Sequence, residues 1–222
     1  MYRGKLYVEG QDDRHVILHP AKDLDAIEKP EDGPGVEIDG CGGDKGVLHA
    51  IPVAVKAAAG SETAAVGFVL DADETVARRW QQVRGALEQL GSQRDDLPGD
   101  MPQGGFIRDI PRLRVKVGVW IMPDNQTDSG KLEDLVAALV PDADALFDFA
   151  RRATEDAAKI EQRFSEPNRR KAELHCWLAW QERPGLRYGA AINAKYLEAG
   201  KPAAARFLDW YQRLFESESP SA

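Results

Sequence analysis

The sequence predicts an α/β fold with a mostly parallel central sheet that is flanked by helices. Two observations indicate this class. Short apolar runs alternate with amphipathic stretches over roughly the first 125 residues, and residues 64–70 form an apolar run rich in β-branched and aromatic side chains. Such a run is typical of a strand buried on both faces of a parallel sheet. After residue 140 the periodicity is helical, so we expect a helical C-terminal extension.

The individual elements follow from local patterns. Strands are expected where short apolar runs are bounded by turn residues, at 5–8, 36–38, 64–70 and 112–121. Helices are expected where apolar residues recur at intervals of three and four, at 11–18, 47–58, 75–90, 131–140, 142–164, 168–180 and 202–214. Gly10 permits the turn after the first strand, Gly91 ends the helix over 75–90, and Pro202 suits a first helical turn.

These elements predict a division of the chain. Residues 1–140 are expected to form the α/β domain, and residues 141–215 a helical extension packed on it. Residues 216–222 are expected to form a disordered tail.

Composition narrows the classes of function. The chain has 222 residues, of which 43% are hydrophobic and 30% charged, as in ordinary globular proteins. No apolar run approaches the ~20 residues that cross a membrane, and the amino terminus lacks the apolar core of a signal peptide. A cytoplasmic protein is therefore expected. The net charge of −8 argues against a surface coated for non-specific nucleic-acid binding, but a local basic groove remains compatible with it.

Acidic residues stand at the ends of two expected strands. Glu9 follows the first strand, and Asp71 and Asp73 follow the strand over 64–70. If these strands are parallel neighbours, three carboxylates meet at one edge of the sheet, where open α/β sheets bind their ligands. Like charges at that distance favour a bound cation, and carboxylate oxygens suit Mg²⁺. Helix capping is the alternative for Asp73 and for Asp13, but it does not account for Glu9 or Asp71.

These motifs resemble the Toprim domain, the metal-binding fold shared by topoisomerases, primases and several nucleases. The resemblance rests on residues 6–13, on residues 68–73 and on the Gly42-Gly43 turn between them. It covers nearly all of residues 1–140. Within this class the chain is similar to small stand-alone bacterial Toprim proteins that are related to the overcoming-lysogenization-defect nucleases.

The resemblance implies a Toprim-like fold and a set of site residues. By likeness to those nucleases the metal ligands would be Glu9, Asp13, Asp71, Asp73 and Glu133, with Lys171 as a catalytic lysine beside Glu9, Asp71 and Asp73. It further implies Mg²⁺ or Mn²⁺ as cofactor and phosphodiester cleavage in DNA or RNA. A homodimer or a protein partner is also compatible with it. Two metal ions would stabilise the attacking and leaving oxygens at phosphorus.

Several alternatives stay open at this level. Asp134 competes with Glu133, since both acids could simply favour a helix N-terminus, and Lys171 could be a solvated helix start. Residues 71–75 also fit the signature of haloacid-dehalogenase-like phosphatases, in which Asp71 would be the nucleophile and Glu9 would be idle. A non-catalytic Toprim module that binds a metal or a partner in a defence system is a third interpretation.

Other polar and aromatic residues carry weaker signals. A basic stripe on the strand over 112–121, formed by Arg112, Arg114 and Lys116, and the pair Arg78 and Arg79 could contact a phosphate backbone. The histidines, among them His175, show no metal-ligand spacing. The tryptophans at 177, 180 and 210 recur among apolar residues at helical spacing, which favours core positions.

Overall fold

The structure is a computed structural model that describes residues 4–22, 35–61, 65–91 and 97–215. The expected tail at 216–222 lies outside these described residues, as does part of the segment between the first helix and the second strand. Among the residues described, no helix is both long and apolar enough to span a membrane.

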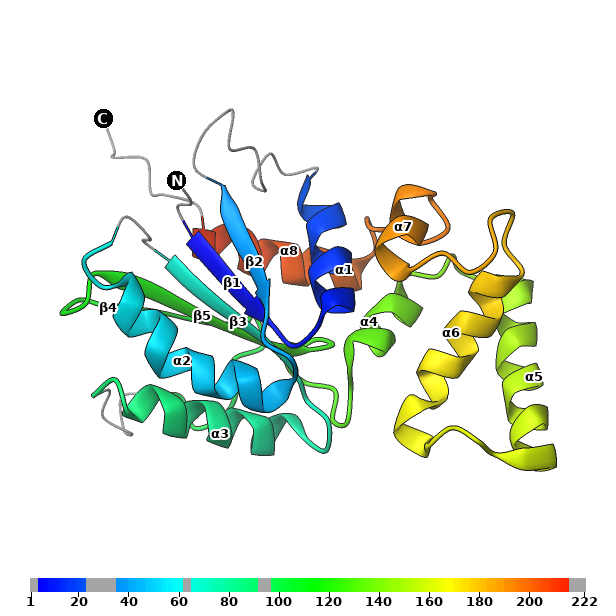
Figure 1. Cartoon of the computed structure of the whole chain (residues 1–222), viewed down its shortest axis with the longest axis horizontal. Coiled ribbons are helices and arrows are strands. Elements are labelled where there is room, and N and C mark those ends of the chain that lie inside the picture. The colour runs from blue at the N-terminus through cyan, green and yellow to red at the C-terminus, as the bar shows by residue number, and fades with distance from the viewer. Residues whose placement is uncertain (1–3, 23–34, 62–64, 92–96, 216–222) are drawn as a thin grey trace.

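A five-stranded sheet with the order β2-β1-β3-β5-β4 forms the centre of the fold (Figure 1). The strands are β1 (Gly4–Val8), β2 (Val36–Gly40), β3 (Ala65–Asp71), β4 (Phe106–Ile110) and β5 (Val115–Met122). The first three strands and β5 are parallel, and only the edge strand β4 runs antiparallel to its neighbour. The expected α/β class with a mostly parallel sheet is therefore confirmed, and β3 lies between β1 and β5 as its apolar sequence indicates.

The helices largely follow the expected pattern. They are α1 (Gln11–Lys22), α2 (Asp44–Ala58), α3 (Val76–Glu88), α4 (Leu132–Ala138), α5 (Ala145–Glu161), α6 (Arg169–Ala179), α7 (Tyr188–Asn193) and α8 (Pro202–Phe215). A short 3-10 turn, η2 (Glu166–Asn168), precedes α6. The short helix α7 was not expected from sequence. Helix α1 also runs to Lys22, four residues beyond the end expected for it at residue 18.

The region before β5 departs from the expected pattern. Residues 106–110 form the edge strand β4, which pairs with β5 through a tight turn at 111–114. Arg114 adopts a left-handed backbone conformation with φ of 55°, so β5 begins only at Val115. Arg112 and Arg114 therefore lie in the turn rather than on the strand. The expected basic stripe with Lys116 is wrong, because the turn interrupts the extended backbone that it requires.

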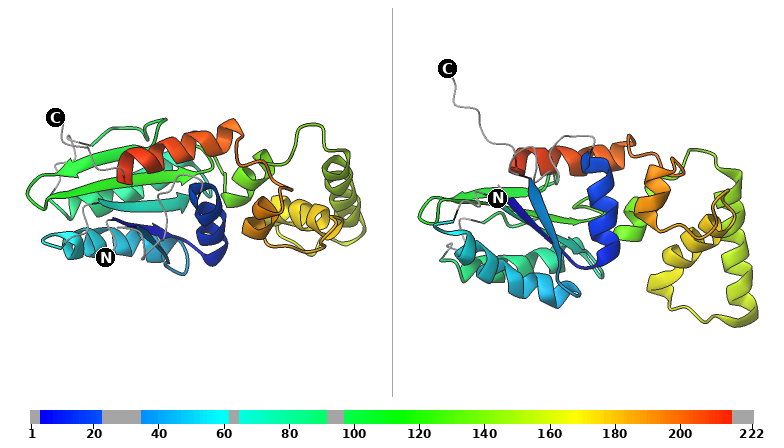
Figure 2. Two further views of the ribbon diagram at one scale, coloured as in Figure 1. Left: turned by 90° about the horizontal axis from the view of Figure 1, so that it is seen from above. Right: turned by 45° about the horizontal axis from the view of Figure 1, so that its top comes forward.

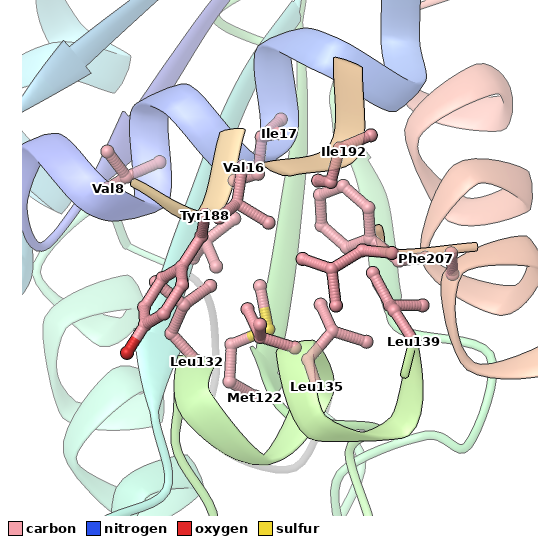
Figure 3. Packing of buried hydrophobic residues seen from close by; sticks show 14 of the residues in the cluster. Val8, Val16, Ile17, Met122, Leu132, Leu135, Leu139, Tyr188, Ile192 and Phe207 are labelled. Carbon is pink, nitrogen blue, oxygen red and sulfur yellow. The ribbon is translucent and has the colours of Figure 1, made fainter. Parts of the chain in front are cut away.

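Helices cover both faces of the sheet (Figure 2). Helices α2 and α3 pack on one face, where Trp80 and Phe68 are fully buried. Helices α1, α4 and α8 contribute to the core on the other face, part of which Figure 3 shows. On that face Trp120 of β5 contacts Phe207 and Trp210 of α8, with ring centroids 5.5 and 5.8 Å apart.

Two glycines allow α8 to lie close to the sheet. A Cβ atom on Gly118 would stand 2.5 Å from a methyl carbon of Leu214, and one on Gly67 would stand 2.9 Å from the same carbon. Trp210 Nε1 also donates a hydrogen bond of 3.1 Å to the carbonyl of Phe106. The last helix thus completes the core of the α/β unit. Helix α8 belongs to the extension expected over residues 141–215, and it packs directly on the sheet.

Helices α5 and α6 pack against each other beyond the end of the sheet (Figure 1). Trp177 is buried between them and contacts Phe147. Trp180, which was expected in the core, is 43% exposed, and its ring is tilted against that of Phe149, which is 51% exposed. The expected burial holds for Trp177 and Trp210 but is wrong for Trp180, because α6 ends at Ala179.

Candidate functional site

The carboxyl ends of β1 and β3 bring most of the predicted acids together. Glu9 directly follows β1, and Asp71 is the last residue of β3, which pairs with β1 in parallel. Asp13 lies in the first turn of α1 and Glu133 in the first turn of α4. These four carboxylates line a single pocket of about 670 Å³.

Backbone hydrogen bonds hold three of these carboxylates in place. Glu9 Oε1 accepts a bond of 2.9 Å from the amide of Asp71, which ties the ends of β1 and β3 together. Asp71 Oδ1 accepts one of 3.0 Å from the amide of Leu132 at the start of α4. Asp13 Oδ2 accepts one of 3.0 Å from the amide of Gly10, so it caps α1 while lining the pocket. Each bond uses one oxygen of its carboxylate.

Burial leaves these acids poorly stabilised as anions. Burial, reinforced by the charges of Glu9, Asp13 and Glu133, raises the pKa of Asp71 to about 8. Burial also raises the pKa of Glu9 to about 7 and that of Asp13 to about 6, against the smaller opposing effect of their backbone hydrogen bonds. At neutral pH the pocket therefore holds negative charge that the surrounding protein compensates only in part.

The fifth predicted ligand, Asp73, is held apart from this group. Its backbone is left-handed, with φ of 56°, which turns the residue after Ala72 away from the line of the strand. Its carboxylate forms ion pairs with Arg79 and, at 2.9 Å, with Lys131. Asp73 lines a neighbouring pocket of about 370 Å³ rather than the larger one. Two cations thus already neutralise this carboxylate.

Arg79 is a buried organising residue that the sequence did not reveal. Its side chain is 4% exposed. Its Nε donates a bond of 2.8 Å to the carbonyl of Asp71, and its Nη1 donates one of 3.1 Å to Asp44 at the start of α2. The expected contact of Arg79 with a phosphate backbone is wrong, because its donors are used inside the protein. Arg78 is exposed and paired with Glu74.

The structure distinguishes the two acids at the start of α4. Glu133 lines the larger pocket and pairs with Lys171 of α6, whose Nζ lies 3.1 Å from Glu133 Oε1. Asp134 instead accepts a bond of 2.9 Å from the amide of Lys131 and pairs with Arg170. Asp134 therefore caps the helix. Lys171 lies in the pocket, as the prediction of a site lysine requires.

Comparison with known protein families matches residues 3–216 to a family described as a protein of unknown function, DUF3226. The chain belongs to this family. No curated protein and no solved structure matches the chain. The family description names no activity.

Three further residues of the DUF3226 chain line the larger pocket from the helical part. They are Asn168 and His175, at and after the start of α6, and Arg187, which directly precedes α7. Sequence reasoning did not connect them with the site. They lie more than 90 positions beyond the end of β3, and no spacing motif links them to it.

The donors of this pocket are suited to a hard cation. Among the described residues, no group of three or more histidine, cysteine or acidic side chains is already arranged to hold a metal ion. Mg²⁺, however, is commonly bound through one or two carboxylates, with water and substrate oxygens completing its shell. Glu9 and Asp71 each have a second carboxylate oxygen beyond the one that accepts the backbone bond. A divalent cation would favour the ionised forms of these two carboxylates, which burial disfavours.

Proposed function

We propose that this pocket binds Mg²⁺, or Mn²⁺ in its place, and supports metal-dependent phosphoryl transfer. The reaction would be phosphodiester cleavage in DNA or RNA. One observation carries the proposal: Glu9, Asp13, Asp71 and Glu133 meet in one pocket at the carboxyl edge of a parallel sheet, and three of them have a raised pKa. Such a concentration of buried acid is costly unless a cation or protons neutralise it.

The likeness of the strand-end motifs to the Toprim domain supports the same proposal. Glu9 and Asp71 would form the primary metal site, because the 2.9 Å bond between them brings the ends of two strands together. Asp13 and Glu133 would complete the acidic wall. Asp73 would join it only after release from Arg79 and Lys131, so we assign it no metal in the present arrangement.

The residues of the chain would have distinct roles in the reaction. A bound divalent cation supplies charge stabilisation for the oxygens at phosphorus. Lys171, placed in the pocket by its 3.1 Å pair with Glu133, would offset charge on the scissile phosphate. Arg79 keeps the end of β3 in position through its bond to the carbonyl of Asp71.

The proposal is tested by Mg²⁺ titration calorimetry and by cleavage of single- and double-stranded oligonucleotides. Glu9→Gln and Asp71→Asn should each abolish Mg²⁺ binding and Mg²⁺-dependent cleavage. Asp39→Asn is the matched control, because Asp39 is an acid on the neighbouring strand β2 that pairs with Lys5 and does not line the pocket. Cleavage that survives both pocket variants would refute the assignment.

The same variants separate two rival functions. A haloacid-dehalogenase-like phosphatase would hydrolyse a small phosphomonoester, lose this activity in Asp71→Asn and keep it in Glu9→Gln. The pairing of Asp73 with Arg79 and Lys131 disfavours that chemistry, since Asp73 would have to act as its acid and base. A non-catalytic module would bind Mg²⁺ and cleave none of these substrates.

A further inference from the structure

The pocket has a second wall that differs from the acidic one in charge. Lys171 and His175 of α6 and Arg187 before α7 line the pocket from the helical part of the chain. Lys171 is paired with Glu133, so its charge is already compensated within the acidic wall. Arg187 is exposed and has no ion pair or hydrogen bond to its side chain among the described residues. Its guanidinium group is therefore available to a ligand.

Tyr188, the residue next to Arg187, carries a buried hydroxyl without a partner. The side chain is 3% exposed, and within the described part of the chain its hydroxyl oxygen makes no hydrogen bond. Figure 3 shows this hydroxyl pointing away from the apolar side chains that surround the ring. Leaving a buried hydroxyl unpaired is unfavourable, so such groups in native proteins usually meet a water molecule or a ligand.

Tyr188 adjoins two residues that line the pocket, since Arg187 precedes it in the chain and the ring of His175 packs against its own ring. Burial raises the pKa of Tyr188 strongly, and the nearby charges of Glu133 and Asp12 raise it further. Both acids line the pocket. The phenol hydroxyl can donate a hydrogen bond. The ring of His175 packs against it, with centroids 5.6 Å apart, which fixes the orientation of the phenol.

We propose that Arg187, His175 and the hydroxyl of Tyr188 form a seat for a phosphate group of a nucleic-acid strand, next to the phosphate held at the carboxylates. A guanidinium group binds phosphate oxygens through two parallel hydrogen bonds, and a buried phenol adds a third donor. Two seats in one pocket select a ligand with consecutive phosphates. The identity of this ligand rests on the proposed function, whereas the presence of the donors does not.

Equilibrium binding of a fluorescein-labelled oligothymidylate tests the seat. Ca²⁺ replaces Mg²⁺ in the assay so that the strand stays intact. Arg187→Ala should weaken binding about tenfold, the scale of one charge-assisted hydrogen bond, and Tyr188→Phe should weaken it by a few-fold. Arg183→Ala is the matched control, because Arg183 is an exposed arginine of the same loop that does not line the pocket. It should bind as the wild type does.

Two controls separate phosphate binding from a purely structural role of these side chains. Tyr188→Phe should not lower the urea midpoint of unfolding, because the hydroxyl has no structural partner among the described residues. A lower midpoint would mean that the hydroxyl stabilises the fold instead. The effect of Arg187→Ala should also vanish on an oligothymidylate with a neutral methylphosphonate backbone. An equal effect on both probes would show that Arg187 does not bind phosphate.

The outcomes separate this inference from the proposed function. Equal weakening by Arg187→Ala and Arg183→Ala would overturn the seat, as would a wild-type protein that does not bind the oligothymidylate. Mg²⁺-dependent cleavage that is unaffected by Arg187→Ala would do the same while leaving the proposed function intact. Strand binding that depends on Arg187, without any Mg²⁺-dependent cleavage, would refute the nuclease proposal and leave the phosphate seat standing.

Discussion

Replacing Asp71 by asparagine should make the metal-free protein more stable at alkaline pH. Asparagine keeps the Oδ1 acceptor for the amide of Leu132 and is nearly the same size as aspartate, so the contact of 3.0 Å is retained. The substitution removes only the ionisable group. Asp71→Asn thus isolates the cost of holding a negative charge at the end of β3, beside Glu9 and Asp13.

The direction and size follow from the raised pKa. The carboxyl of Asp71 titrates near 8 in the folded protein, against an ordinary value of 3.8, so the folded state binds more protons between these values. The stability of the wild type therefore falls as pH rises from about 4 to about 8. At about 1.4 kcal/mol per pKa unit, ionising Asp71 lowers the free energy of unfolding by at most about 5 kcal/mol at pH 8. Entry of water into the pocket and proton exchange among the neighbouring acids reduce this loss. We therefore expect Asp71→Asn to raise the free energy of unfolding by about 1–3 kcal/mol.

Urea unfolding of metal-free protein at pH 5 and pH 8 measures this effect. The gain in stability of Asp71→Asn over the wild type should be clearly larger at pH 8 than at pH 5, whereas Asp39→Asn, outside the pocket, should show no such gain. Mg²⁺ should stabilise the wild type at pH 8, by about 2.7 kcal/mol at a hundredfold excess over its dissociation constant, and should have little effect on Asp71→Asn. A variant that is less stable than the wild type at pH 8 would refute the reasoning.

Three further substitutions probe the surroundings of the site. Arg79→Met should lower the free energy of unfolding by about 2–4 kcal/mol in urea, because it breaks a buried ion-pair network; a loss below 1 kcal/mol would contradict this organising role. Gly118→Ala should lower the free energy of unfolding by about 1–3 kcal/mol, because the new methyl group collides with Leu214 of α8. Gly85→Ala in α3 should leave this free energy unchanged or raise it, because no atom lies within 4 Å of the new methyl group. Glu133→Gln should weaken Mg²⁺ binding measured by calorimetry. Asp134→Asn should lower the melting temperature and leave Mg²⁺ binding unchanged. The opposite result for the two variants would show that Asp134, and not Glu133, is the metal ligand.

Local patterns were sufficient to predict most of the elements and the pairing of two strand ends. The apolar run of β3 predicted a central strand, and Glu9 and Asp71 could be placed together because parallel strands end at the same edge of a sheet. The edge strand β4 was missed because its five residues include Arg108 and Asp109 and pair on one side only, so they lack a continuous apolar signal. The turn at Arg114 was missed because residues 112–117 alternate between basic and apolar side chains, as the residues of a half-exposed strand do.

The roles of single charged residues depended on contacts between distant segments. Asp71 and Asp73 look equivalent in sequence, yet Arg79 and Lys131 neutralise only Asp73. Glu133 and Asp134 are likewise adjacent acids, and the helix cap and α6 separate their functions. An ion pair depends on distances of a few ångströms that sequence spacing does not determine.

The sequence by itself therefore determined the α/β class, the central strand and the acidic strand ends, because these features depend on periodicity and on neighbours along the chain. Only the tertiary structure decided that α8 completes the core, that Asp73 is already neutralised, and that Arg187 lines the pocket beside the buried hydroxyl of Tyr188. The physical reason is the same in each case. Burial and charge compensation depend on side chains that folding brings together from positions as far apart as residues 9 and 187.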